Sequence, residues 1–534
     1  MSGFHFSPRP NRANEIKWRE WGDAAFAEAR ERNVPVLLGI SAVWCHWCHV
    51  MDETSYSASD IITTINERYV AIRVDNDERP DVNRRYNMGG WPSTVFLTPS
   101  GEIVHGATYV PPEEFWRLLI TMSDLWNEKG EDLQRRVAEA RAEEEAARAP
   151  KPGDLSREIV DIVGALVRGQ YDPQHGGFGR EPKFPQTKLL HFLLDEYRRH
   201  EAPELATMLR TTFDAMSSRG MYDHVEGGFF RYATTREWNA PHYEKMLEDN
   251  AELLAVYADA HLMFADAGFD RVVRDVIRWM DAVLYQPEIG LWSGSQDADE
   301  HYYTLDAAER ATHDPPFVDR RLYTAWNALA ASAYVRAGEV LGDDALYLRG
   351  ANAARAIDER LRDASGALCR YDDGNGPQRP DLLADVVAYL SLLLDLGDVE
   401  GARSLAGRVR ERLEDLERGG FYDAPAGADI GRLARRERPI EDNAAAADAL
   451  LRLAAQSGDE EWRDIALRAL RSFVGEYRAS GQFAASYANA VAKALREPVS
   501  PSTSDGPRTS AARPFPWLLS PISFARSAGL DRTC

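Results

Sequence analysis

The sequence predicts a multidomain protein in which a small α/β domain precedes a larger all-α domain. Strand and helix signals alternate through residues 1–110, whereas residues 154–495 show almost only helical periodicity. The chain has 534 residues, of which 44% are hydrophobic, so it is too long for one compact core and apolar enough to fold. Two unlike domains account for both observations.

The first domain is organised around one apolar segment, residues 34–41. Such a run is typical of a central strand that is buried on both faces. Residues 98–101 have the composition of a turn, and residues 103–104 regain strand character as a hairpin partner. Asp23 is expected to cap the first helix. The other expected elements are strands at residues 69–75 and 93–97 and helices at residues 23–32 and 112–126, which together make a small sheet of mixed strand directions.

The second domain contains a loose internal repeat. Long amphipathic stretches recur and are separated by a turn of two glycines and an aromatic residue, or a variant of it. Repeated helical hairpins can stack as an open solenoid or close into an (α/α) toroid. Turns rich in His, Asp, Trp and Gln favour the toroid, whose loops line a central funnel. The helical stretches lie near residues 155–170, 186–219, 241–285, 321–362, 380–415 and 440–478, and the turns at 176–178, 227–229, 290–292 and 419–421.

These patterns divide the chain into four segments. Residues 1–126 form the α/β domain, residues 127–153 connect the domains through a charged helix, and residues 154–495 form the toroid. Residues 496–534 are rich in Pro and Ser and reverse the charge balance, which predicts a disordered tail. The abrupt change after Val499 also suggests an out-of-frame ending.

Composition excludes several functional classes. Acidic residues outnumber basic ones by 85 to 63, and the formal charge of −22 disfavours binding to nucleic acid. The N-terminus lacks an apolar signal core, and no run is long and apolar enough to span a bilayer. Four cysteines cannot form a disulfide scaffold in a chain of this length. We therefore expect a cytoplasmic protein that binds neither nucleic acid nor membrane.

The strongest chemical signal is the pair Cys45 and Cys48, which directly follows the central strand. If Cys45 caps the next helix, free backbone N–H groups and the helix dipole stabilise its thiolate, and Cys48 can resolve a mixed disulfide. His46 lies between the two cysteines, where a cationic imidazole would assist. Pro92 precedes the strand at 93–97, as does the cis-proline that faces the CxxC in thioredoxin-like folds. We expect Cys45 to attack and Pro92 to position the backbone of a partner.

Other interpretations of the motif remain open. The two cysteines could be packed without redox function. Zinc has donors in Cys45, His46, Cys48 and His49, but four ligands within five residues cannot easily surround one tetrahedral ion. The Cys-x-x-Cys-His pattern also matches haem attachment, which would require export. We expect no metal and no cofactor.

The motifs together resemble a known family. Residues 41–51, 74–81 and 89–99 look like the spermatogenesis-associated thioredoxin-like family. The similarity continues through residues 176–185, 221–229, 241–250, 295–299 and 324–327, and spans roughly residues 10–495. It implies a thioredoxin-like α/β domain followed by an (α/α)6 toroid of the six-hairpin glycosidase type. It implies no settled reaction.

The loops and helix starts of the toroid supply candidate ligand residues. Pro241 is expected to start a helix on which His242, Lys245 and Asp249 share one face, with Glu244 on a neighbouring face. A His, a cation and a carboxylate together could transfer protons or hold a polyol. Such residues can also merely satisfy turns and caps. The remaining candidates are Tyr222, Asp223, His224, Gln296, Asp297 and Asp299 in glycine-rich loops and Trp326 and Asn327 in a motif of the resemblance.

Three functional hypotheses follow. The first is thiol–disulfide exchange at Cys45 and Cys48 with a protein partner, fused to a toroid whose polar pocket takes a sugar or other small molecule. The second is a carbohydrate-active enzyme, a hydrolase or epimerase that uses the His224, His242 and Asp297 region, with the small domain as a docking module. The third is a non-catalytic scaffold.

Overall fold

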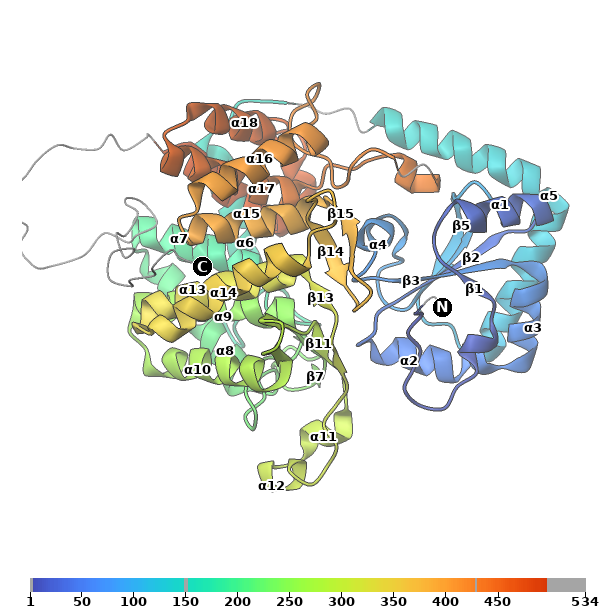
Figure 1. Ribbon diagram of the computed structural model, residues 1–534, viewed down its shortest axis with the longest axis horizontal. Helices are drawn as coiled ribbons and strands as arrows, with labels where there is room; N and C mark the ends of the chain where they lie inside the picture. Colours follow the sequence, from blue (N-terminus) through green and yellow to red (C-terminus); the bar gives the residue numbers. More distant parts are fainter. Residues whose placement is uncertain (1–2, 148–151, 428–429, 497–534) are drawn as a thin grey trace, which may run out of the picture.

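The computed structural model describes residues 3–147, 152–427 and 430–496 and places an α/β domain beside a ring of helices (Figure 1). The predicted fold class, a thioredoxin-like α/β domain followed by an (α/α)6 toroid, is confirmed. The domain boundaries stay a prediction, and the expected tail, apart from residue 496, lies outside the described residues. Within the described ranges every helix is too short or too polar to traverse a bilayer.

The N-terminal domain contains a five-stranded sheet in the order β1-β3-β2-β4-β5. The first three strands in this order are parallel, and β4 and β5 continue the sheet antiparallel, as the mixed directions predicted. The strands are β1 (Trp18–Arg19), β2 (Val36–Ser41), β3 (Val70–Asp75), β4 (Ser93–Leu97) and β5 (Ile103–Ala107). The helices are α1 (Asp23–Arg32), α2 (His46–Glu53), α3 (Ser59–Arg68), α4 (Pro80–Tyr86) and α5 (Pro112–Ala147), with a kink in α5 at Lys129.

Successive side chains of each strand point to opposite faces of the sheet, so the core of this domain has two layers. Val36, Leu38 and Ile40 of β2 pack with α1 on one face of the sheet, and Leu37 packs with α3 and α5 on the other. The central strands are therefore buried on both faces, which explains their continuous apolar sequence. One expectation is wrong in detail: the residue that caps α1 is Gly22, and Asp23 is the first helical residue.

The helical domain is a closed ring of six hairpins. Six inner helices contact each other in the cyclic order α7, α9, α13, α15, α17, α19 and back to α7. The inner helices are α7 (Thr187–His200), α9 (Leu247–Phe264), α13 (Thr324–Leu341), α15 (Leu383–Asp395), α17 (Ile440–Ser457) and α19 (Ala485–Ala494). The outer helices are α6 (Arg157–Gln170), α8 (Pro203–Ser218), α10 (Ala267–Trp279), α14 (Asp344–Arg360), α16 (Val399–Leu413) and α18 (Glu460–Arg471). Contacts of α19 with α6 and α7 close the ring, so the toroid and not the solenoid is formed.

Short strands and helices fill the loops at the mouth of the ring. They position the loop residues that face the thioredoxin-like domain. The short strands are β6 (Tyr232–Ala233), β7 (Pro241–His242), β8 (Lys245–Met246), β9 (Tyr285–Gln286), β10 (Leu291–Trp292), β11 (Ser295–Gln296), β12 (Val318–Asp319), β13 (Leu322–Tyr323), β14 (Cys369–Asp372) and β15 (Pro377–Pro380). The short helices α11 (Glu300–Thr304) and α12 (Ala307–Arg310) project from the ring beside the small domain (Figure 1).

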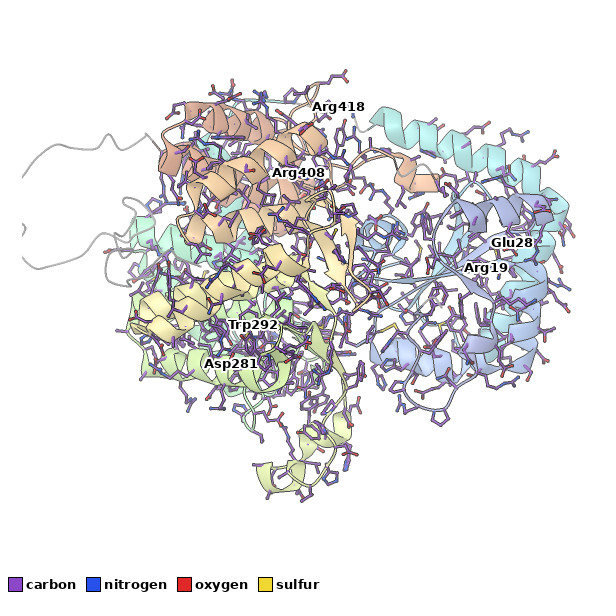
Figure 2. All side chains as sticks on the ribbon, in the orientation of Figure 1. Arg19, Glu28, Asp281, Trp292, Arg408 and Arg418 are labelled. Carbon is purple, nitrogen blue, oxygen red and sulfur yellow. A yellow bond between two sulfur atoms is a disulfide. The ribbon has the colours of Figure 1, made fainter. Side chains whose placement is uncertain are left out.

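An asparagine pins the aromatic turn in three of the hairpins. The side chain of Asn327 accepts from the backbone N–H of Trp292 and donates to the carbonyls of Trp292 and Tyr323. Asn250 makes the same three contacts with Phe229 and Met246. Asn443 makes them with Phe421 and Pro439. Each asparagine is the fourth residue of an inner helix, so the sequence repeat is a repeated structural unit; Trp292 is labelled in Figure 2.

In a second repeated contact, a lysine ammonium group bonds to an aspartate that precedes the glycine turn and to a carbonyl of the turn itself. Lys183 donates to Asp172 and to the carbonyl of Gly176. Lys245 makes the equivalent contacts, at 2.6 Å to Asp223 and 2.9 Å to the carbonyl of Gly227. These buried pairs fix the extended segment that leads into the next inner helix.

The two domains are joined firmly along one edge. Leu433, in the short helix η4 (Gly431–Ala434), is buried in the core of the thioredoxin-like domain. Tyr86 accepts a hydrogen bond from the backbone of Arg432 and donates to Gly101. The backbones of Gly101 and Gly431 approach so closely that a Cβ on Gly101 would lie 2.7 Å from the Cα of Gly431. Residues of the toroid therefore complete one core layer of the smaller domain.

Candidate functional site

Cys45 and Cys48 are joined by a disulfide at the N-terminus of α2. Cys45 is the N-cap residue, as predicted, and its Sγ accepts a hydrogen bond from the backbone N–H of Cys48 at 3.2 Å. Cys45 has the extended backbone conformation of an N-cap residue. β2 ends at Ser41, and the chain turns from there directly into the motif. The fold thus presents both sulfurs where unpaired backbone N–H groups converge.

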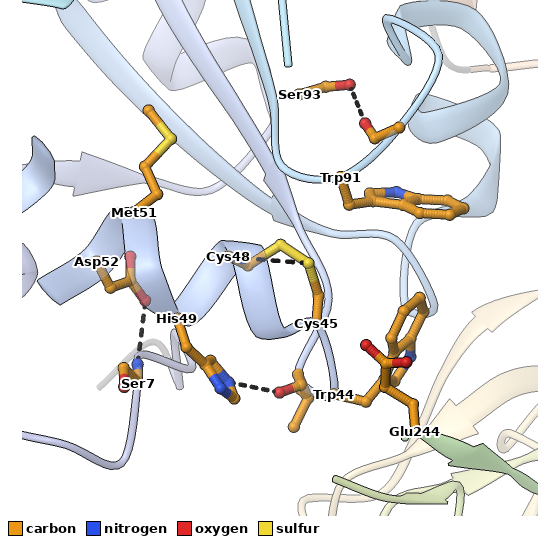
Figure 3. The surroundings of a disulfide bond; sticks show 12 residues. Ser7, Trp44, Cys45, Cys48, His49, Met51, Asp52, Trp91, Ser93 and Glu244 are labelled. Atoms are coloured by element: carbon orange, nitrogen blue, oxygen red, sulfur yellow. Dashed lines mark hydrogen bonds between the residues drawn. A yellow bond between two sulfur atoms is a disulfide. The ribbon is translucent and has the colours of Figure 1, made fainter. Parts of the chain in front are cut away.

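The peptide bond between Trp91 and Pro92 is cis, as predicted. In the sheet, Ile40 pairs with Ser93, so Pro92 lies beside the end of β2, next to the turn that leads to Cys45. Ser93 donates to the carbonyl of Gly90 and accepts from the backbone of Met88, which holds the loop in place. Figure 3 shows Trp91 and Ser93 on one side of the disulfide.

His49 is the histidine that the structure ties into this site. Its Nε2 donates to the carbonyl of Val43 at 2.8 Å (Figure 3). Its Nδ1 lies 3.7 Å from Asp297 of the toroid. Burial lowers the pKa of His49 and raises that of Asp297 to about 7. The expected imidazole, His46, is half-buried, and its ring packs edge-on against Trp47 instead.

Trp44 links the cysteine motif to the toroid. Its indole N–H donates to Asp77 at 2.7 Å, and its ring meets Trp91 edge-on. Arg231, from the loop after a glycine turn of the toroid, lies over both indoles, 4.2 Å from Trp44 and 5.1 Å from Trp91. Trp44 and Trp91 directly precede Cys45 and Pro92, so Arg231 lies over the two side chains that flank these residues in sequence.

Glu244 is an acidic residue of the toroid that lies at the same interface as Arg231. It is buried, and Figure 3 shows it beside Trp44. Although burial alone would raise its pKa, His242 and Arg231 hold it below the usual value. His242 stacks on Tyr232 and lies 3.7 Å from Glu244. One oxygen of Glu244 has no hydrogen-bond partner among the described residues.

These contacts bury the disulfide. Cys45 is 5% exposed and Cys48 is 2% exposed, and both belong to the same apolar cluster as the core of the toroid. A cavity of only about 10 Å³ lies beside Cys48, between His49, Asp52 and Arg73. A folded protein cannot reach the sulfurs in this arrangement.

A larger cavity opens at the mouth of the toroid. It measures about 330 Å³, within the range of small-molecule sites. The N-terminal ends of α7, α9, α17 and α19 surround it, and Arg231 forms part of its wall. The side chains of Phe184 and Phe483, 41% and 62% exposed, lie at the cavity. Its other lining residues are Pro185, Gln186, Thr187, Lys188, Leu189, Asp249, Glu441, Gln482 and Ala485.

Carboxyl groups with raised pKa values concentrate around this mouth. Burial raises the pKa of Asp249 to about 7, and burial together with Glu252 does the same for Glu248. On the facing domain, burial and Asp75 raise the pKa of Asp77 to about 8. Buried acids of this kind can gain or lose protons near neutral pH, as general acids and bases must.

The structure corrects the expected helix face. Pro241 and His242 form β7, Lys245 lies in β8, and α9 begins only at Leu247. His242, Lys245 and Asp249 therefore share no helix face. The extended backbone prevails because Lys245 must reach back to Asp223 across the glycine turn.

Only part of the predicted toroid set meets at the interface. Asp297 lies near His49, and Glu244 lies beside Trp44 (Figure 3). His242 lies close to Glu244, and Asp249 lines the larger cavity. The assignment of these residues as ligand-binding stays a prediction.

The remaining candidates take part in structural contacts. Asp223 and Lys245 form the buried pair that Arg310 joins, and Asn327 pins the aromatic turn. Exposed His224 bonds only to the carbonyl of Arg219. The others are Tyr222, bonded to Asp275; Gln296, bonded to Trp279; Asp299, the N-cap of α11; and Trp326, packed on Tyr323.

Sequence reasoning missed three residues of the site, Arg231, Asp77 and Glu441. Arg231 belongs to no periodic pattern, and its role depends on a contact with the other domain. Asp77 lies inside a stretch that the resemblance did single out, residues 74–81. Among the described residues, no group of three or more His, Cys, Asp or Glu side chains is arranged to hold a metal ion.

Comparison with known proteins supports the division into two parts. Residues 9–144 match the family Thioredox_DsbH, described as a protein of unknown function, DUF255. An uncharacterized protein of Caenorhabditis elegans is 34% identical over 306 residues, which are 54% of this chain and 42% of the worm protein. Human spermatogenesis-associated protein 20 is 27% identical over 601 residues, covering 86% of this chain and 76% of the human protein. The resemblance predicted from the motifs is confirmed.

A shorter match concerns the thioredoxin-like part. The thiol:disulfide interchange protein DsbD 1 of Pseudomonas aeruginosa is 34% identical over 84 residues, which are 15% of this chain and 14% of that protein.

Solved structures resemble the toroid. A D-mannose isomerase superposes with a TM-score of 0.52 at 12% identity, over 65% of this chain and 99% of its own. Cellobiose 2-epimerase from Spirochaeta thermophila gives the same TM-score at 14% identity, over 64% of this chain and 94% of its own. At this level of identity the likeness concerns the fold.

Proposed function

We propose that the protein carries out thiol–disulfide exchange at Cys45 and Cys48. The observation that carries the proposal is the disulfide itself, formed at the N-cap of α2 beside the cis bond of Trp91 and Pro92. A structural staple would not need this placement, whereas an exchange centre does, because the helix N-terminus stabilises the thiolate that must form and leave.

The reaction is a two-electron exchange with a dithiol partner. A partner thiolate attacks Sγ of Cys45, the bond to Cys48 breaks, and Cys48 leaves as a thiolate that takes up a proton. The second partner thiol then loses its proton and attacks the mixed disulfide, so that the partner is oxidised and the cysteine pair is reduced. The same steps in reverse order oxidise the cysteine pair and reduce the partner.

A redox titration of the full-length chain tests this proposal. In a Cys369→Ser, Cys534→Ser background only the pair remains. The oxidised protein is equilibrated in glutathione or dithiothreitol buffers, and thiols are counted by the gel shift of a maleimide-linked polymer. We expect a two-electron transition between about −120 and −270 mV, the range of exchange proteins. A midpoint below about −300 mV would identify a structural disulfide instead.

Trapping provides the matched pair of variants. Cys48→Ser leaves the attacking thiol without its resolving partner, so it should accumulate a mixed disulfide with a thioredoxin variant that lacks its own resolving cysteine, when glutathione disulfide oxidises the two thiols together. Cys45→Ser should accumulate far less, because Cys48 lies inside α2 and not at the N-cap that stabilises a thiolate. Equal or absent trapping in both variants would contradict the assigned roles.

The cavity of the toroid supports a second candidate function, the binding or conversion of a sugar. Carboxyl groups of Asp249 and Glu441 can accept hydrogen bonds from neighbouring hydroxyls, and the rings of Phe184 and Phe483 offer faces for a sugar ring. The fold shared with a D-mannose isomerase and a cellobiose 2-epimerase is compatible with this function.

A ligand panel tests the second candidate. Mannose, glucose, cellobiose and their amino derivatives are added at millimolar concentration, and the thermal midpoint is recorded. We expect a shift of several degrees with one of the neutral sugars, and loss of that shift in Asp249→Asn. Asp464→Asn, at an exposed site on α18, is the matched control. No shift with any sugar would contradict the candidate.

A further inference from the structure

We propose that the toroid is a hinged lid on the Cys45–Cys48 disulfide, fixed to the thioredoxin-like domain at one edge and latched at the other by Arg231 over Trp44. Exchange with a protein partner then requires the latched edge to open. This inference rests on the proposed thiol–disulfide exchange and names what controls it.

The covered surface is the one that a partner must reach. Cys45, Trp44 and the Trp91–Pro92 bond form one face of the small domain, and thiol exchange requires a sulfur of the partner to approach along it. In this structure the occupant of that face is the toroid of the same chain, which contributes Arg231, Glu244 and Asp297.

The latched edge combines a few polar contacts with one apolar contact, because Trp44, Cys45 and Cys48 pack in the same apolar cluster as the core of the toroid. Arg231 contacts two indoles, and His49 faces Asp297 at 3.7 Å, beyond hydrogen-bonding distance. A guanidinium over a desolvated indole contributes modestly, and both groups can be hydrated once apart. Opening this edge must also hydrate the apolar contact and separate Arg321 from Glu78, which lie 3.0 Å apart. It must break the 2.9 Å hydrogen bond from Arg370 to the carbonyl of Asp77 as well, so the open form is a minor population.

The opposite edge resists separation. Leu433 is buried in the core of the small domain, and Arg85 forms a buried pair with Asp423 at 2.8 Å. Its guanidinium also donates to the carbonyls of Arg432 and Arg435. Opening this edge would expose apolar surface and an unpaired charge, so motion that frees the disulfide pivots here.

Reduction kinetics of the oxidised full-length chain test the lid. Reduced thioredoxin is the protein reductant and dithiothreitol the small one, and the pair is followed by maleimide gel shift. With thioredoxin the wild-type rate should level off as its concentration rises, because opening becomes limiting. Arg231→Ala should raise the limiting rate about three- to tenfold, since loss of the cation–π contact shifts the opening equilibrium.

The control is Arg210→Ala, which removes an equivalent arginine–aromatic contact, to Phe264, on the toroid. It should leave the reduction rate unchanged. Asp297→Asn removes the carboxylate that faces His49, which is the other contact of the latch, and should also accelerate reduction. This variant keeps the test valid if Arg231→Ala does not fold. Circular dichroism confirms folding of each variant.

The outcomes separate the lid from the exchange reaction. If thioredoxin reduces the wild type and both latch variants at the same rate without levelling off, the lid is wrong and the exchange function stands. If thioredoxin reduces none of the folded proteins, although dithiothreitol reduces the urea-unfolded chain, the exchange function fails and the lid fails with it.

Discussion

Arg231 of the toroid lies over the indole of Trp44, with its guanidinium carbon 4.2 Å from the ring centroid. Trp44 directly precedes Cys45 in sequence, and Arg231 also forms part of the wall of the larger cavity. One side chain therefore connects the cysteine motif with the cavity at the mouth of the ring. Two sites that appear separate along the chain share this wall.

The stability of the protein should depend on pH through Asp297. Its pKa of about 7 in the folded state lies above the value of about 3.9 for an unfolded aspartate. Between these values the folded chain holds a proton that the unfolded chain has lost, so stability falls as pH rises from about 4 to 7 and then levels off. Around Asp297 lie Glu244, Asp299, Arg9 and His49.

Thermal unfolding of Asp297→Asn at pH 5 and pH 8 measures this contribution. The wild type should lose more stability over this range than the variant, by at least about 3 °C in the midpoint. Asp464→Asn, at an exposed site on α18, serves as the control and should follow the wild type. Parallel pH profiles for all three proteins would show that Asp297 does not titrate as described.

Removal of Lys245 should destabilise the toroid strongly. Its ammonium group is buried and paired with Asp223, and burial lowers its pKa to about 8. Lys245→Met leaves a buried carboxylate with Arg310 as its remaining cation, at a cost of about 3–5 kcal/mol. Urea denaturation checks the value, with Lys188→Met, whose side chain is half exposed, as the control. A loss below about 1 kcal/mol would argue that the pair contributes no net stability.

The three asparagine contacts should be equivalent in energy. Asn327→Ala removes hydrogen bonds to the backbone of Trp292 and Tyr323 and leaves buried groups unpaired, which should cost about 3 kcal/mol. Asn250→Ala and Asn443→Ala remove the same contacts from other hairpins and should cost similar amounts. Chemical denaturation compares them with Asn352→Ala on α14. A large difference among the three losses would mean that the hairpins share the geometry of this contact but not its contribution to stability.

The fixed edge of the lid should make the two domains unfold together. Leu433→Ala removes buried apolar surface from the core that the domains share, at a cost of about 3 kcal/mol. We expect calorimetry to show one transition for the wild type and two for this variant, since the domains are then less coupled. Leu348→Ala, at an exposed position on α14, should keep a single transition. A single transition in both variants would show that Leu433 does not couple the domains.

Much of the fold was predictable because local signals agreed with it. The apolar run at 34–41 became β2, and the periodic stretches became hairpins of the ring, since burial of these faces is what such patterns encode. The expected helix face from Pro241 was wrong for an equally physical reason. Lys245 bonds to a residue 22 positions earlier, and no local propensity reports that contact.

By itself the sequence determined the two domain types, the capped Cys45 with its partner Cys48, and the cis-proline beside them, because each depends on neighbours within a few residues or on periodicity. Only the tertiary structure decided that the disulfide is covered, that His49 and not His46 meets a carboxylate, and that Arg231 belongs to both sites. These facts arise where one domain packs on the other, and contacts between residues roughly 190 to 250 positions apart leave no pattern in a single chain.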